Sequence, residues 1–154
     1  MDLDTLLNKN QKEAATYLDS HLRIIAGAGS GKTRVVTYRI AHLIQDIGID
    51  PRSILAITFT NKAANEMKER VNEIVGIHGS GTLICTIHSL CVRLLRQHIN
   101  VLNYPSNFTI MDEEDQKALI KKLYTQLEIY AKVISIKSMI NTISSYKTAR
   151  VTPQ

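Results

Sequence analysis

Hydrophobic residues in the first half of the chain form short continuous runs that alternate with longer stretches of helical period. Residues 22–26 are apolar except at Arg23, and glycines follow at once, which predicts a buried strand that breaks into a tight turn. The apolar positions after this turn have helical spacing and predict a helix with one buried face, ended by Gly48: Val36, Ile40, Leu43, Ile44 and Ile47.

The same order of strand and helix recurs twice. Residues 54–59 predict a strand followed by a helix through Ala63, Met67 and Ile74, and residues 83–87 predict a strand followed by a helix from Leu90. Alternation of this kind predicts an α/β fold in which helices flank a parallel sheet. The glycine-rich stretch 76–81 is interpreted as a surface loop within this domain.

Beyond residue 107 the pattern becomes helical. Residues 108–111 could add one short strand, after which residues 119–130 and 136–143 predict two helices. Asp112 stands where an N-terminal cap is wanted, with Asp115 three residues later. We therefore expect one domain over 1–110 and the start of an all-helical subdomain over 111–154.

Composition narrows the class of protein. A chain of 154 residues, 44% hydrophobic, can bury a core, and no window resembles a secretion signal or a membrane span. Cys85 and Cys91 are too few for a disulfide scaffold, so the cytoplasm is the expected compartment. The net charge of +5 would assist binding to a polyanion but does not identify one.

The strongest chemical signal is the stretch Ala-Gly-Ala-Gly-Ser-Gly-Lys-Thr at 26–33, which matches the Walker A pattern except for alanine in place of its first glycine. Glycines let backbone N–H groups turn toward a phosphate at the positive end of the next helix, although such a turn can also serve packing alone. Lys32 would reach the β- and γ-phosphates of ATP, and the Thr33 hydroxyl would bind Mg²⁺. The predicted phosphate-binding residues are Ala26, Gly27, Ala28, Gly29, Ser30, Gly31, Lys32 and Thr33.

Three further stretches are distinctive: Leu-Asn-Lys-Asn-Gln at 7–11, Ile-Thr-Phe-Thr-Asn-Lys-Ala-Ala at 57–64, and Gly-Thr-Leu-Ile-Cys-Thr-Ile-His-Ser at 81–89. Together with 26–33 they resemble the N-terminal part of the UvrD/Rep/PcrA-type superfamily-one DNA helicases. The resemblance implies a RecA-like domain, ATP and Mg²⁺ as cofactors, single-stranded DNA as partner, and 3′–5′ unwinding in repair or replication.

The resemblance also implies roles for individual residues. In the nucleotide site, Gln11 would read the edge of adenine and Arg34 would pack on its face. The remaining residues match positions that contact single-stranded DNA in the family, with Phe59 stacking on a base: Phe59, Thr60, Asn61, Lys62, Thr86, His88 and Ser89.

Each of these residues also has a structural explanation. Phe59 could be core, Asn61 could cap the next helix, and Thr86 or Ser89 could cap the helix after the third strand. Cys85, His88 and Cys91 do not have the paired spacing of a zinc site. Asp112 follows an apolar run, as a metal-binding Walker B aspartate would, but we interpret it as the N-terminal cap of the following helix.

The family places its Walker B aspartate, its catalytic glutamate and its arginine fingers later in the sequence than residue 154. We therefore expect an incomplete sheet, self-association through its unpaired backbone, and ATP binding without turnover. Two other functions remain open: a small P-loop kinase or NTPase acting on a metabolite, with Asp112 as metal ligand, and a regulatory nucleotide-binding module. Only the helicase portion should bind single-stranded DNA with strong salt dependence.

Overall fold

A computed structural model describes residues 1–130 and 132–152, and the chain divides into two compact units, Met1–Ser106 and Asn107–Gln154. The helices and strands of the first unit are α1 (Leu3–Leu6), α2 (Lys9–Thr16), α3 (Lys32–Gln45), β1 (Leu55–Thr58), α4 (Asn61–Val75), β2 (Leu83–Thr86) and α5 (Ile87–His98). Short 3-10 turns lie at Pro51–Ser53, Gly76–Gly79 and Ile99–Leu102. The second unit contains α6 (Glu113–Gln126) and α7 (Ile136–Thr148). Among the described residues, no helix is both long enough and apolar enough to span a bilayer.

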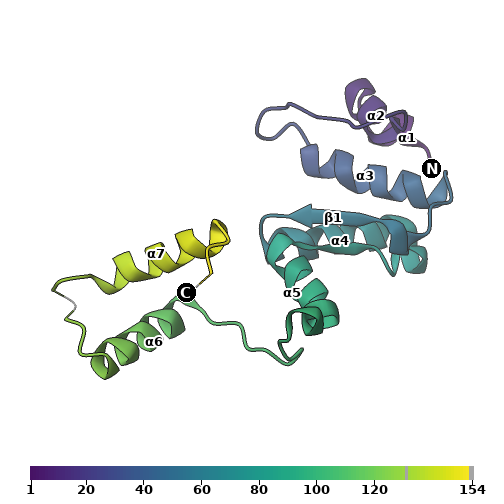
Figure 1. Cartoon of the computed structure of the whole chain (residues 1–154). Coiled ribbons are helices and arrows are strands. Elements are labelled where there is room, and N and C mark those ends of the chain that lie inside the picture. The colour runs from purple at the N-terminus through teal and green to yellow at the C-terminus, as the bar shows by residue number, and fades with distance from the viewer. Residues whose placement is uncertain (131, 153–154) are drawn as a thin grey trace. The chain divides into compact units, whose positions relative to one another are not determined.

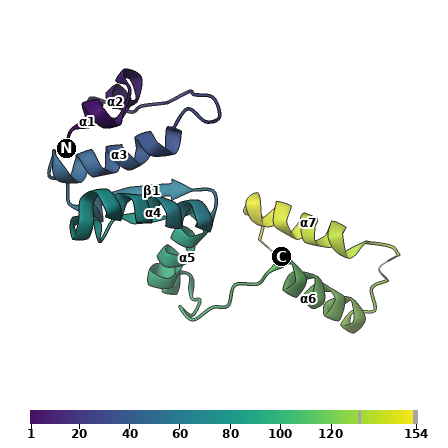
Figure 2. The same cartoon turned by 180° about the vertical axis from the view of Figure 1, so that it is seen from behind.

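Two short strands form a parallel sheet, with Leu55 opposite Leu83 and Thr58 opposite Thr86. The connection between them is α4, as expected for parallel strands, which cannot be joined by a tight turn. In both views α3 lies between the α1–α2 pair and the layer formed by α4 and β1 (Figures 1 and 2). The predicted α/β class and the second and third strand–helix pairs are thus confirmed.

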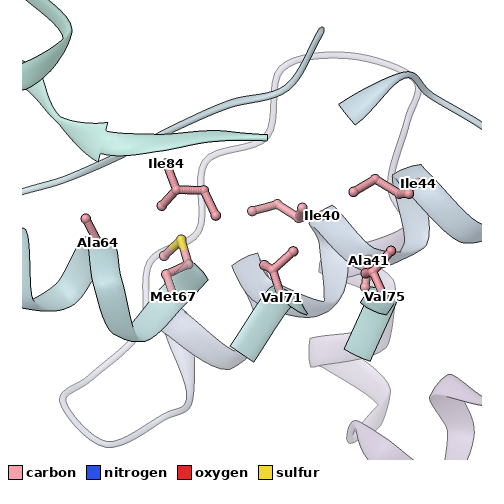
Figure 3. Packing of buried hydrophobic residues seen from close by; sticks show 8 residues of the cluster. All are labelled: Ile40, Ala41, Ile44, Ala64, Met67, Val71, Val75 and Ile84. Atoms are coloured by element: carbon pink, nitrogen blue, oxygen red, sulfur yellow. The ribbon is translucent and has the colours of Figure 1, made fainter. Parts of the chain in front are cut away.

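The main core lies where α3 and α4 meet one face of the sheet. Figure 3 shows Ile84 of β2 directed toward side chains of both helices, and Ile84 is only 1% exposed. The helical spacing seen in the sequence explains this burial, because residues three and four apart lie on one helix face. The cluster comprises Ile40, Ala41, Ile44, Ala64, Met67, Val71, Val75 and Ile84.

The other face of the sheet remains open to solvent. Leu55 and Ile57 of β1 are 49% and 48% exposed, whereas the alternate residues Ala56 and Thr58 are partly buried. Parallel sheets are usually covered on both faces. Within the described residues, this sheet therefore has one covered and one uncovered apolar face.

The predicted strand at 22–26 is wrong. This segment has no regular secondary structure, and Leu22, Ile24 and Ile25 are 42%, 40% and 84% exposed. A parallel strand is stabilised by a hydrogen-bonded neighbour and by burial. The only strand pair in the described part of the chain is β1 with β2, so the run lacks a partner. The possible strand at 108–111 is likewise not formed.

The second unit is a pair of packed helices in which Ile120 and Tyr124 are buried. The Asp112 carboxylate accepts hydrogen bonds from the backbone N–H groups of Glu114 and Asp115, both at 2.8 Å. The Asp115 side chain in turn accepts from the Asp112 N–H at 3.3 Å, which completes a capping box. The predicted cap is therefore confirmed. The assignment of 1–110 and 111–154 to two helicase subdomains stays a prediction.

Candidate functional site

The glycine-rich stretch 26–33 begins as a curled turn, which ends at Gly31, and its last two residues are the first two of α3. Gly29 and Gly31 have φ angles of 75° and 84°, in the left-handed region that glycine adopts without steric cost. The Ser30 hydroxyl donates to the Gly27 carbonyl at 2.8 Å and closes the turn. The local sequence thus produces a tight turn directly before a helix even though the preceding strand is not formed.

Lys32 is exposed and folds back over this turn. Its Nζ donates to the carbonyl of Ala26 at 3.0 Å and to that of Gly27 at 2.6 Å. The ammonium therefore lies near the start of α3, whose free N–H groups and positive dipole end attract an anion. An anion bound there would be attracted by the Lys32 ammonium and by the positive end of the α3 dipole. It would also compete with the carbonyls of Ala26 and Gly27 for the hydrogen bonds of the ammonium.

Gln11 lies beside the turn, although 19 residues separate it from Ser30. Its Oε1 accepts the Asn8 N–H at 3.1 Å as part of the capping box of α2, and its Nε2 donates to the Ser30 carbonyl at 3.0 Å. A Cβ at Gly31 would come within 2.8 Å of the same Nε2. Glycine is thus favoured at 31 by its backbone angle, and a larger residue there would displace the end of the Gln11 side chain.

A hollow of 260 Å³ lies between α2 and the turn. Gln11, Asn8, Ser30 and Lys32 contribute polar groups to its walls, while Val35 contributes an apolar one. The structure therefore brings the predicted adenine-reading residue and the predicted phosphate-binding residues to one place. The sequence alone suggested this proximity only through the family resemblance.

Arg34, the other predicted adenine contact, is exposed at the first turn of α3. Its Nη2 donates to the Leu6 carbonyl at 2.8 Å, and its guanidinium carbon lies 5.4 Å from the centre of the Tyr38 ring. Both contacts hold the side chain across α1 and α3, with cation–π attraction to Tyr38. Arg34 therefore has structural contacts in addition to any contact with a base.

Arg39 is a residue that the sequence analysis did not single out. From the middle of α3 its Nη1 donates to backbone carbonyls at the end of α2, at 2.6 Å to Tyr17 and 3.1 Å to Ala14. The sequence contains no signal for this contact, because its acceptors are backbone atoms more than 20 residues away.

A second group of predicted site residues lies just after β1. Phe59 is fully exposed, at 104% of its reference area, so its alternative interpretation as a core residue is wrong. Thr60, rather than Asn61, caps α4, because its Oγ1 accepts the Ala63 N–H at 3.1 Å. Asn61 and Lys62 are exposed in the first turn of that helix.

The third group follows β2. Thr86 is nearly buried and caps α5: its Oγ1 accepts the Ser89 N–H at 3.2 Å and lies 2.9 Å from the Ser89 Oγ. His88 and Ser89 are exposed. Because Thr58 and Thr86 are paired in register, the second and third groups follow strands that end at the same edge of the sheet. In parallel sheets this carboxyl edge is where ligands bind.

No set of three potential metal ligands among histidine, cysteine and acidic residues lies together in the described part of the chain. Cys85 is partly exposed, Cys91 is exposed, and both are free thiols. The Thr33 hydroxyl is an exposed oxygen at the start of α3, which is the kind of ligand that Mg²⁺ takes alongside phosphate oxygens.

An α/β domain with a glycine turn before a helix and exposed polar groups at the carboxyl edge of its sheet is typical of nucleotide-binding proteins. The chain belongs to the UvrD/REP helicase family, because the model of the UvrD/REP helicase N-terminal domain matches residues 7–154.

Two relatives illustrate the similarity. The chain is 46% identical over 148 residues to the ATP-dependent DNA helicase PcrA of Bacillus subtilis (strain 168). It is 45% identical over 147 residues to the ATP-dependent DNA helicase PcrA of Staphylococcus aureus (strain Mu50). Each alignment covers 96% of this chain and 20% of the relative, so the chain spans about a fifth of their length.

Proposed function

We propose that this chain is the ATP-binding and single-stranded-DNA-binding portion of an ATP-dependent 3′–5′ DNA helicase that unwinds DNA in repair or replication. The observation that carries the proposal is the curled turn at 26–33 with the Lys32 ammonium folded over it at the start of α3. Membership of the UvrD/REP helicase family and the similarity to the PcrA helicases support it.

In the nucleotide site, backbone N–H groups of 26–33 and the Lys32 ammonium hold the phosphates. Gln11 reads the edge of adenine, and Arg34 packs on its face. The Thr33 hydroxyl holds Mg²⁺, which supplies charge neutralisation of the phosphates when bound. Gln11 keeps one amide hydrogen and one oxygen lone pair beyond its contacts with Ser30 and Asn8, which suits a base edge that both donates and accepts.

In the DNA site, Phe59 offers a solvent-exposed ring on which a base can stack. Asn61, Lys62, His88 and Ser89 supply exposed polar groups for the strand backbone at the same sheet edge. Thr60 and Thr86 act mainly by capping the helices that carry these groups. The net charge of +5 favours a polyanionic partner.

We assign 1–110 to part of the first RecA-like domain and 111–154 to the beginning of a helical insertion. DNA as substrate favours a cytoplasmic location. ATP turnover needs the metal-binding and water-activating groups that the family resemblance places later in the sequence, so this portion binds without hydrolysing. The metabolite-kinase alternative relied on Asp112 as metal ligand, and the capping of α6 by that carboxylate argues against it.

Titration of the purified chain with Mg-ATP and with a fluorescent single-stranded oligonucleotide tests both halves of the proposal. We expect saturable ATP binding, and DNA binding that weakens steeply between low and moderate salt. A small-molecule kinase would bind ATP and leave the oligonucleotide free, which would refute the DNA half. Absence of ATP binding would refute the nucleotide half.

A further inference from the structure

Helix α2, which carries Gln11, is held at both of its ends by groups from outside the helix. Near its start, Gln11 Nε2 donates to the Ser30 carbonyl at 3.0 Å. At its end, Arg39 Nη1 donates to the carbonyls of Ala14 and Tyr17 at 3.1 and 2.6 Å. Between these contacts, Ala15 is fully buried in a small apolar cluster with residues of α1 and α3.

Arg39 meets a need that α2 cannot meet by itself. The last carbonyls of any helix lack partners within the helix, and a cation near them also interacts favourably with the helix dipole. The last turn of α2 contains no basic residue, so the charge comes from α3. A helix of eight residues is too short to be stable alone, which makes its position dependent on such contacts.

We propose that Arg39 is a positioning residue for base recognition: by holding the end of α2 it keeps the Gln11 amide at the hollow where adenine binds. The inference rests on the proposed role of Gln11 in reading adenine. Arg39 lies seven residues beyond Lys32, about 10 Å farther along α3. Loss of the Arg39 side chain therefore lowers the preference for ATP over GTP and leaves the affinity for the triphosphate group unchanged.

The test compares three ligands on the 154-residue chain by calorimetry in the presence of Mg²⁺: ATP, GTP and inorganic tripolyphosphate. In Arg39→Ala, ATP affinity falls about five- to tenfold, the effect of losing one or two hydrogen bonds at the base. Affinities for GTP and tripolyphosphate stay within about twofold of the wild-type values, because neither ligand uses the adenine contact. Arg70→Ala, at an exposed position on α4, is the matched control and changes none of the three.

A double-mutant cycle separates positioning from general loosening of the fold. If Arg39 acts through Gln11, Arg39→Ala adds nothing to the loss of ATP-over-GTP preference in Gln11→Ala. Arg39→Lys keeps the charge but not the planar fork, and it restores part of the preference. Should Arg39→Ala lose its helical circular dichroism signal, Arg39→Lys and its cycle with Gln11→Ala decide the matter.

An unchanged ATP-to-GTP ratio in the Arg39 variants overturns the inference while leaving the proposed function in place. Additive effects in the cycle, or equal losses of ATP and tripolyphosphate, also overturn it, because they indicate a structural role alone. A wild-type chain that binds neither ATP nor tripolyphosphate overturns the proposed function and this inference with it.

Discussion

Replacing Lys32 by alanine is the most direct test of the nucleotide site. The substitution removes an exposed side chain whose Nζ donates hydrogen bonds to the carbonyls of Ala26 and Gly27. Because these are surface hydrogen bonds, their loss should change the free energy of unfolding by less than about 1 kcal/mol. The bound state differs, because there the ammonium makes charge-assisted contacts with phosphate, worth about 1.5–3 kcal/mol net.

That range corresponds to a loss of about 10- to 150-fold in ATP affinity. Calorimetric titration of wild type and Lys32→Ala measures it, with thermal denaturation to show that the fold survives. Lys68→Ala, at an exposed position on α4, removes the same charge far along the chain from the turn and should leave the affinity unchanged. Equal ATP affinity in wild type and a folded Lys32→Ala would refute the assignment of 26–33 as the phosphate site.

Three further perturbations test other parts of the molecule. Phe59→Ala should weaken binding of a single-stranded oligonucleotide by about 1–3 kcal/mol, measured by fluorescence anisotropy, while ATP affinity stays constant; unchanged DNA affinity would remove Phe59 from the interface. Ile57→Lys should reduce self-association in sedimentation experiments, because it places a charge on the uncovered sheet face, and a wild-type chain that stays monomeric at all concentrations would contradict this. Asp46→Asn should lower the free energy of unfolding at neutral pH, since the hydrogen bond with His42, followed by that with the N-terminal ammonium, lowers the pKa of Asp46. The lowered pKa means that wild type begins to lose this advantage as pH falls below the ordinary value of about 3.9, so the difference measured by urea denaturation should be smaller at pH 3 than at pH 7.

Local patterns in the sequence predicted those features that depend on neighbouring residues. The helices α3, α4 and α5 follow from apolar residues at helical spacing, and the cap of α6 follows from Asp112 with Asp115 three residues later. The turn at Gly29 and Gly31 likewise follows from residues that tolerate positive φ. Each of these features depends on residues within a few positions of one another, so it can be predicted from the sequence alone.

Features that depend on a partner distant in the sequence could not be predicted in this way. The apolar run 22–26 has the composition of a strand, yet a strand also needs a hydrogen-bonded neighbour, which the described residues do not supply. Phe59 ends an apolar run, so a place in the core remains open as its alternative in the sequence, and only the packing of β1 decides that it is fully exposed.

By itself, then, the sequence predicted the two strands that form, the helices from α3 to α7, the glycine turn and the family to which the chain belongs. The tertiary structure decided that Gln11 meets Ser30 and that Arg39 holds the end of α2. The physical reason is that these contacts join a side chain to a backbone carbonyl, and every residue presents the same carbonyl whatever its side chain.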